Sequence, residues 1–293
     1  MIAWVEVSPR DGLQNEAVHL PTADKITLIR RAADAGAKRI EVASFVNPAK
    51  VPQMADAEAV IAGLPAGTAR TIGLVLNERG ARRALATAVD EIGVVCAASD
   101  TFGIRNQGLD ASASLAMACN VVRLCREAGR DAQVTIAVAF GCPFEGAVDP
   151  ARVVTMAREI AAAGAIEIAV ADTIGVARPG EVERLVAEVA AAVRPLPVRV
   201  HFHDTRGMGV ANVMAAVRAG AVTVDAAIGG TGGCPFAPGA AGNVASEDVA
   251  YALGEAFGAD LAKLVATAGW LGEKLGRTQT SAVARAMGSV TKT

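Results

Sequence analysis

The sequence predicts an α/β protein of the (β/α)₈ TIM barrel class. Short β-branched runs alternate with Ala-rich helical stretches along almost the whole chain, and the strand-like runs number eight. These runs are continuously apolar, which is typical of parallel strands that are covered on both faces. No GxGxxG motif follows the first run. That absence and the count of eight favour the barrel over the alternative, an open doubly wound sheet.

The expected elements follow one another in regular order. Strands are expected at 2–7, 39–44, 70–76, 91–97, 134–140, 166–172, 198–203 and 222–228. Helices are expected at 23–36, 53–63, 78–88, 111–129, 150–163, 179–193, 207–219, 246–257 and 260–275. Pro150 and Pro179 each stand at a helix start, and glycine closes several helices, as the two helix ends prefer.

A single domain is expected over residues 1–293. The barrel takes up about 2–257 in this interpretation, and a C-terminal helical extension and tail form 258–293. No linker or low-complexity segment divides the chain, and single barrels of this size are common. From residue 276 onward the apolar pattern weakens, which indicates a loosely held tail.

The composition indicates a globular cytoplasmic protein. Of the 293 residues 52% are hydrophobic and 20% are charged, and the net charge is −2. Basic runs and long uncharged apolar runs are both missing, so we expect no nucleic-acid partner and no membrane partner. The five cysteines are an odd number without a CxxC pair, and no signal peptide is evident. Both features indicate a reducing compartment without disulfides.

Ionisable and polar side chains gather where the expected strands end. In barrels of this class the chemistry lies at the carboxyl ends of the strands and in the loops that follow them. The residues found there are Arg10, Asp11 and Gln14 after the first strand, Glu41 and Ser44 on the second, Asp172 on the sixth, His201 and His203 on the seventh, and Cys234 and Asn243 after the eighth. We expect one active site at this end, with Arg10, Gln14 and Ser44 as substrate contacts.

The histidine pair is the sharpest of these signals. His201 and His203 lie two apart on a strand, so their side chains project from the same face. Two imidazoles at a barrel mouth are placed to bind one metal ion, and the alternatives are two core histidines or a proton relay. The chain has three histidines and two share this face, which favours the metal. With Asp11 as the nearest carboxylate, the donors suit Mg²⁺ or Mn²⁺, and Zn²⁺ is less favoured.

Arg10 and Glu41 are expected to form a pair. Arg10 is a permanent charge in a Pro- and Gly-flanked turn, where it is placed to hold a carboxylate or a developing enolate. A surface ion pair is its alternative fate. Glu41 lies inside an apolar strand and therefore needs a partner. The alternative for Asp172 is a helix cap, which is disfavoured because the next helical pattern begins only near Arg178.

The segment GGTGGCPFAPGAAGN, residues 229–243, places Cys234 among glycines and prolines, where no regular element forms. It is either a phosphate-binding loop with an incidental thiol or a mobile flap with a reactive one. The other four cysteines lie in expected strands and helices or before a proline. We expect them to be small apolar packing residues.

Six segments together resemble 3-hydroxy-3-methylglutaryl-CoA lyase. They are VSPRDGLQNE, SFVNPAKVPQMAD, GCPFEG, ADTIGV, HFHDT and GGCPFAPGAAGNVASEDVAYAL, and they run in the same order from residue 5 to about 255. The resemblance implies a metal-dependent TIM barrel that cleaves a 3-hydroxyacyl-CoA into acetyl-CoA and a keto acid. Acetoacetate is the keto acid for the type substrate. A homodimer is compatible with the family.

The resemblance also implies a role for each matching residue. Asp11, His201, His203 and Asn243 would be the metal ligands. Arg10 would neutralise the thioester enolate, and Cys234 would protonate the acetyl-CoA carbanion. Glu41 and Asp172 would position groups or shuttle protons, with Asp172 and His201 as acceptors of the hydroxyl proton. A flap rich in glycine would close over the substrate and exclude water.

The chain also departs from this family's usual pattern around the acyl pocket. The departures fall at Gln133, Thr135, Ala137, Val138, Ala169, Arg206 and Met208, where the pocket loses hydroxyl groups and gains methyl groups. These departures leave the identity of the substrate's acyl chain undetermined, and a bulkier, more apolar 3-hydroxyacyl-CoA is an alternative substrate. Two further alternatives are a Claisen-type condensing acyltransferase and a non-catalytic binder of CoA or metal. The intact metal set disfavours the binder.

Overall fold

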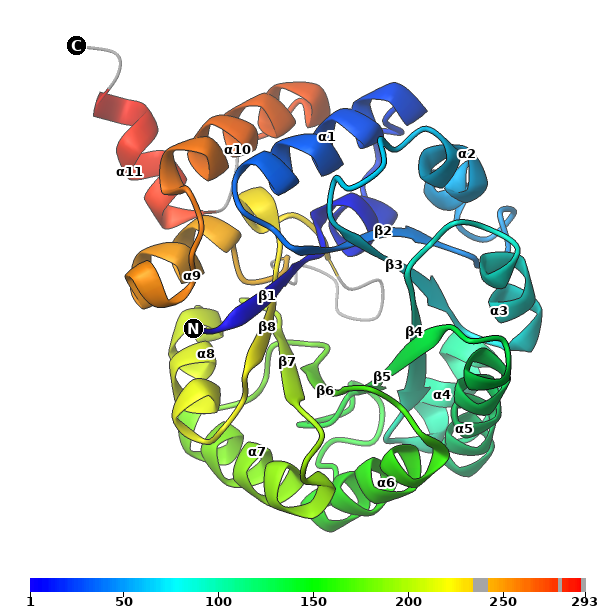
Figure 1. Ribbon diagram of the computed structural model, residues 1–293. Coiled ribbons are helices and arrows are strands. Elements are labelled where there is room, and N and C mark those ends of the chain that lie inside the picture. The colour runs from blue at the N-terminus through cyan, green and yellow to red at the C-terminus, as the bar shows by residue number, and fades with distance from the viewer. Residues whose placement is uncertain (234–241, 279–280, 291–293) are drawn as a thin grey trace.

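The computed structural model describes residues 1–233, 242–278 and 281–290, and its eight strands close into a parallel barrel (Figure 1). Each strand pairs with its neighbour in sequence, and β8 closes the barrel on β1. The strands are β1 (Ala3–Glu6), β2 (Arg39–Ser44), β3 (Arg70–Val75), β4 (Glu91–Ala97), β5 (Asp131–Ala137), β6 (Ile168–Asp172), β7 (Val198–Phe202) and β8 (Thr223–Ala226). The predicted (β/α)₈ barrel is confirmed.

Helices surround the barrel in an outer ring (Figure 1). They are α1 (Thr22–Asp34), α2 (Ala57–Ala62), α3 (Glu78–Leu85), α4 (Asp100–Gln107), α5 (Ala111–Glu127), α6 (Pro150–Ala163), α7 (Pro179–Val193), α8 (Gly209–Arg218), α9 (Ser246–Leu253), α10 (Leu261–Leu275) and α11 (Ala282–Val290). Short helical turns lie at η1 (Ser8–Gly12), η2 (Pro52–Met54), η3 (Ile228–Gly230) and η4 (Gly254–Ala256). Within the described residues, no helix is long and apolar enough to cross a bilayer.

The main hydrophobic core lies between the strands and the helices, as expected for strands that are covered from outside. The barrel interior is different. A small apolar cluster of Val5, Val7, Ile72 and Ala227 lies inside it. Buried charged side chains occupy other positions along the strands. Because burial of an unpaired charge is costly, Arg10, Glu41 and Arg199 lie in ion pairs, and this polar interior positions the site.

The C-terminal extension is more ordered than its sequence pattern indicates. A loosely held tail was expected from residue 276, but residues 282–290 form α11, which packs against α9 and α10 (Figure 1). Asp248 of α9 accepts hydrogen bonds from Ser281 Oγ at 2.9 Å and from the Val283 backbone N–H at 2.8 Å. This contact satisfies the first turn of α11 from another helix, which a local pattern does not reveal.

The sequence pattern does not predict α4 or η1, and strand β5 is shifted from its expected position. Strand β5 begins three residues earlier than expected and ends at Ala137, because Val138 has a φ of 52° and leaves the sheet. Helix α4 is short and has little amphipathic pattern, and it ends at Gly108 in the left-handed conformation. The π-helical turn η1 follows β1 directly and contains Asp11.

Candidate metal centre at the barrel mouth

A cavity of about 150 Å³ opens at the carboxyl ends of the strands. Arg10, Asp11, Glu41, His201 and His203 all line it, although they come from three separate regions of the chain. Gln14 lines it too. The structure therefore brings together the predicted residues of strands one, two and seven, which confirms that they share one location.

Asp11 is positioned by the tight turn η1. The backbone N–H groups of Arg10 and Gly12 both donate to the carbonyl oxygen of Val7, at 3.2 and 3.1 Å. Gly12 passes so close to Thr231 that an added Cβ would lie 2.3 Å from the Thr231 Oγ1 atom. Glycine is therefore needed at this position. The close approach joins the turn that carries Asp11 to the segment that follows β8.

The two histidines lie side by side and face Asp11. Their ring centroids are 5.3 Å apart, and His201 Nε2 lies 3.9 Å from Asp11 Oδ2. One donor atom from each of Asp11, His201 and His203 lies within 4.8 Å of the others. Two nitrogens and a carboxylate oxygen at this spacing can converge on one divalent cation. The predicted same-face projection of the histidines is confirmed.

Asn243, the fourth predicted ligand, lies at the same place. Its Nδ2 donates to Asp11 Oδ2 at 2.7 Å and to the Thr231 carbonyl oxygen at 3.1 Å, and its backbone forms a bridge with His203. Its Oδ1 is buried and accepts no hydrogen bond from any described residue. A buried amide oxygen without a donor beside an Asp–His–His set fits a site that holds a cation.

Arg10 forms a fork between two carboxylates. Nη1 lies 2.6 Å from Asp11 Oδ1, and Nη2 lies 2.6 Å from Glu41 Oε2. The predicted Arg10–Glu41 pair is confirmed. Burial raises the pKa of Glu41 more than the Arg10 charge lowers it. For Asp11, burial also raises the pKa, but the charges of Arg10 and the histidines outweigh it and leave the pKa lowered.

Asp225 of β8 is a site residue that the sequence analysis missed. It is in register with His201 in the sheet, and its Oδ2 lies 3.2 Å from His201 Nδ1. Burial lowers the pKa of His201, but the Asp225 hydrogen bond and the Asp11 charge outweigh burial and raise it. A carboxylate on the far nitrogen orients an imidazole whose other nitrogen binds a metal. The sequence signal that could have identified Asp225 is its position as the single acidic residue within an apolar strand.

Asp172, Ser44 and Cys234 are placed differently from the cavity residues. Asp172 is buried outside the described lining, where its two oxygens accept the backbone N–H groups of Val176 and Ala177, both at 2.9 Å. Burial raises its pKa against these hydrogen bonds. Ser44 is fully buried at the end of β2, outside the described lining. Cys234 lies outside the described residues.

The remaining cysteines match their expected role. Cys96, Cys119, Cys125 and Cys142 are free and buried. Burial raises the pKa of Cys125 to about 11, so its thiol stays protonated and unreactive near neutral pH. Packing is therefore sufficient to explain these four side chains.

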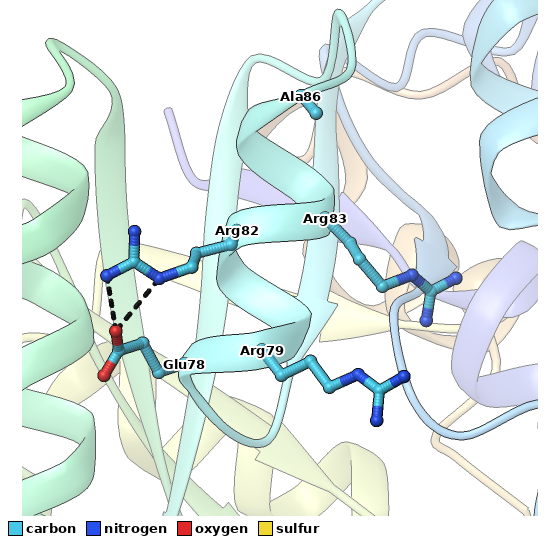
Figure 2. A pocket seen from close by; sticks show the side chains of 5 residues that line it. All are labelled: Glu78, Arg79, Arg82, Arg83 and Ala86. Carbon is cyan, nitrogen blue, oxygen red and sulfur yellow. Dashed lines mark hydrogen bonds and ion pairs between the residues drawn. The ribbon is translucent and has the colours of Figure 1, made fainter.

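A second hollow lies on the outer surface of α3 and is lined by Arg79, Arg82 and Arg83 with Glu78 and Ala86 (Figure 2). Arg82 donates to Glu78 one turn earlier, as Figure 2 shows, and Arg83 pairs with Glu58 at 2.7 Å. These are contacts of a solvated helix face. The hollow has no donor set for chemistry, so the cavity at the mouth is the candidate site.

Two buried carboxylates hold the segment that leads from β8 toward Cys234. Glu6 accepts the backbone N–H of Ile228 at 3.0 Å, and Glu247 accepts that of Gly229 at 2.9 Å. Both side chains are fully buried. Burial raises the pKa of Glu247 to about 8, against backbone hydrogen bonds that lower it. The nearby Glu6 charge raises it further.

A Glu247→Gln variant is expected to gain stability relative to the parent as the pH rises from about 5 to about 8. The folded pKa of Glu247 is raised to about 8 from 4.5. Between these two pKa values the Glu247 carboxyl group is ionised in the unfolded chain and protonated in the folded protein, so folding stability is lost as the pH rises. Glutamine does not titrate and therefore removes this loss of stability. The Tm of the parent and of the variant at pH 5 and at pH 8 checks the prediction, with Glu183→Gln at an exposed position of α7 as the control. An equal Tm difference at both ends of the window contradicts it.

A closed parallel barrel with an Asp–His–His donor set at the carboxyl ends of its strands is the architecture of a metal-assisted TIM-barrel enzyme. The HMGL-like family model matches residues 1–270. The chain is 41% identical to (R)-citramalyl-CoA lyase of Chloroflexus aurantiacus, over 97% of this chain and 94% of that relative. It is 40% identical to 3-hydroxy-3-isohexenylglutaryl-CoA/hydroxy-methylglutaryl-CoA lyase of Pseudomonas aeruginosa, over 98% and 97% of the two chains.

The crystal structure of hydroxymethylglutaryl-CoA lyase from Pseudomonas aeruginosa has the same fold, with a TM-score of 0.93 and 39% identity. The match covers 100% of this chain and 98% of that one. The chain therefore belongs to the HMGL-like family, and it is a carbon–carbon lyase.

Proposed function

We propose that the protein cleaves a short 3-hydroxyacyl-CoA, either 3-hydroxy-3-methylglutaryl-CoA or a close analogue such as citramalyl-CoA, into acetyl-CoA and a keto acid. The observation that carries this proposal is the convergence of Asp11, His201 and His203 in one cavity with Arg10. The hydroxyl must lose its proton while the adjacent carbon–carbon bond breaks and its electron pair becomes the thioester enolate. The cavity offers groups for both events.

Asp11, His201, His203 and Asn243 would hold the divalent cation. Oxygen donors beside two imidazoles favour Mg²⁺ or Mn²⁺ over Zn²⁺. When bound, the cation supplies Lewis-acid chemistry, which lowers the pKa of a substrate hydroxyl. In the protein itself, Asp225 orients His201, and Thr231 and Asp11 orient the Asn243 amide.

Arg10 is assigned the stabilisation of the negative charge on the thioester enolate. Glu41 fixes its guanidinium from one side and Asp11 from the other, so the positive charge is oriented before substrate arrives. A preorganised charge at the oxygen where negative charge develops is a large part of catalysis in such sites. Glu41 therefore acts in this proposal as a positioning residue for Arg10.

The hydroxyl proton is assigned to the Asp225 carboxylate. In this proposal both ring nitrogens of His201 are occupied, because Nε2 would bind the cation and Nδ1 lies 3.2 Å from Asp225 Oδ2. Of the two predicted acceptors, His201 lines the cavity, and Asp172 does not belong to its described lining. Asp172 holds the loop after β6 through two backbone hydrogen bonds, and Thr173 of that loop lines the cavity. We therefore propose that Asp172 is a positioning residue and that the proton leaves toward Asp225, which also lines the cavity.

A Cys234→Ala variant is expected to lose turnover by about a hundredfold, as the loss of a general acid does. Cys234 is assigned the protonation of the acetyl-CoA carbanion, and metal binding does not need it. The measurement is the steady-state rate together with metal affinity by calorimetry. Cys119→Ala, which changes a buried cysteine on α5, is the matched control. Near-normal cleavage by Cys234→Ala would show that the acid role is wrong.

The test of the proposed function is acetyl-CoA release from 3-hydroxy-3-methylglutaryl-CoA and from citramalyl-CoA, with Mg²⁺ or Mn²⁺ and with an EDTA control. Strong metal-dependent release from either ester supports the proposal and identifies the substrate. Absence of release while metal is still bound in a parallel titration rejects these two substrates. Absence of both release and metal binding rejects the metal-dependent mechanism.

Location and assembly also remain proposals. A cytoplasmic location is supported by the four free, buried cysteines. The homodimer follows from the family resemblance, and sedimentation of the purified chain tests it.

A further inference from the structure

Arg199 of β7 lies at the inner end of the cavity. It precedes His201 by two residues, so it is on the same inward face and about 6.6 Å further back along the strand. Arg199, Thr135 and Asp225 all line the cavity, and the Arg199 residue is only 3% exposed. A permanent charge therefore forms part of the floor beneath the candidate metal centre.

The guanidinium of Arg199 is fixed by neighbours on β5 and β8 and by Glu167, which directly precedes β6. Nη2 donates to Gln133 Oε1 and, at 3.1 Å, to Thr135 Oγ1. Nη1 lies 3.5 Å from Asp225 Oδ1, and Nε lies 3.5 Å from Glu167 Oε2. The hydrogen bonds that Arg199 makes to described residues both leave from Nη2. Nη1 and Nε face carboxylates at a longer distance, so the floor retains hydrogen-bond donors.

Gly93 of β4 makes room for this arrangement. A Cβ at this position would lie 3.0 Å from Gln133 Nε2 and 3.2 Å from Ile72 Cγ2, so a larger residue would displace the amide that holds Arg199. The Thr135 hydroxyl accepts from Arg199, which leaves its own proton free to donate into the cavity. The inner end of the cavity is therefore polar, with the Arg199 guanidinium and the Asp225 carboxylate side by side.

The size of the cavity limits what can reach this floor. Pockets that enclose a drug-sized ligand measure roughly 300–1,000 Å³. The volume of about 150 Å³ is smaller, so the enclosed part accommodates an acyl group and the CoA moiety lies outside it. A long hydrocarbon branch directed at Arg199 and Thr135 would leave their donors without partners, which is costly in a buried site.

We propose that Arg199 is a specificity-determining residue, which selects short acyl chains that end in a carboxylate or another oxygen group and rejects a long hydrocarbon branch. This proposal rests on the proposed lyase function and names its substrate class. The two relatives act, by their names, on citramalyl-CoA and on an isohexenylglutaryl ester, at nearly equal identity to this chain. Overall identity does not separate these substrate classes, and in this proposal the floor of the cavity decides between them for this chain.

The test compares kcat/KM for citramalyl-CoA, 3-hydroxy-3-methylglutaryl-CoA and 3-hydroxy-3-isohexenylglutaryl-CoA on the parent enzyme and on Arg199→Met. We expect the parent to prefer the short esters. Arg199→Met should shift the ratio toward the isohexenyl ester by at least about tenfold. A ratio measured on one protein cancels any loss of folded or metal-loaded enzyme, so partial damage from the lost contacts of Arg199 with Asp225 and Glu167 does not hide the result.

Two further variants separate this role from a structural one. Arg39→Met removes another interior arginine that pairs with Glu167, at 2.9 Å, but does not belong to the described lining of the cavity. Its ratio should equal that of the parent. Arg199→Met/Glu167→Gln also removes the carboxylate that faces Arg199 Nε, and it should show the same shift of the ratio as Arg199→Met.

A parent enzyme that cleaves the isohexenyl ester as well as the short esters would overturn the proposal. So would an unchanged ratio in both Arg199 variants. If the parent cleaves none of the three esters, the lyase assignment for this substrate class fails, and the same three esters are then compared by calorimetric binding. A preference for the short esters that Arg199→Met reverses still supports the role of Arg199, and equal affinities overturn it.

Discussion

A His203→Ala variant is expected to lose both metal binding and turnover. Metal affinity should fall by more than about a hundredfold, because even outer partners of a ligand are worth 10–100-fold. Turnover should fall by about 10³, since a cation supplies several kcal/mol of transition-state stabilisation and each ~1.4 kcal/mol is tenfold. His203 is placed for this role by its bridge to Asn243 and its proximity to His201.

The measurement is calorimetric titration of Mn²⁺ into the apo protein, together with the rate of acetyl-CoA release. His19→Ala is the matched control, because His19 is exposed and does not belong to the described lining of the cavity. It should leave both quantities unchanged. A His203→Ala protein that keeps the parent's metal affinity would show that the donor set has been assigned incorrectly.

An Arg10→Met variant is expected to lower kcat by about 10³, the upper range for loss of one preorganised charge-stabilising group. The guanidinium satisfies Asp11 and Glu41 at once, with both contacts at 2.6 Å. Its removal leaves Glu41 as an unpaired buried carboxylate, which costs on the order of 3–5 kcal/mol of folding stability. The Tm should therefore fall together with the rate.

Arg10→Lys separates the two effects. Lysine keeps the charge, but a single ammonium does not reproduce the two-pronged contact. The Tm should recover more fully than kcat. Any nearby positive charge neutralises Glu41, whereas stabilisation of the enolate needs a charge held in one orientation. Arg82→Met on the exposed face of α3 is the control for removal of an arginine. If Arg10→Met retained full kcat with only a lower Tm, Arg10 would be purely structural.

The sequence by itself determined the barrel and most of its site. Eight apolar runs of strand length, separated by helices, leave few ways to cover a parallel sheet on both faces, and closure into a barrel is one of them. The spacing of His201 and His203 fixed their shared face, because strand geometry is local. Glu41 was recognisable because an isolated acid in an apolar strand must have a partner, and Arg10 provides it.

Only the tertiary structure decided which polar groups share the cavity and which stabilise loops. Asp172 ends an apolar strand and Asp225 lies within one, and nothing local shows which of the two faces the cavity. The sheet places Asp225 beside His201, while Asp172 accepts the backbone N–H groups of its own loop. Arg199 was hidden for the same reason. Its partners come from β5, from β8 and from the residue before β6. Contacts between residues this far apart in sequence depend on barrel register and closure.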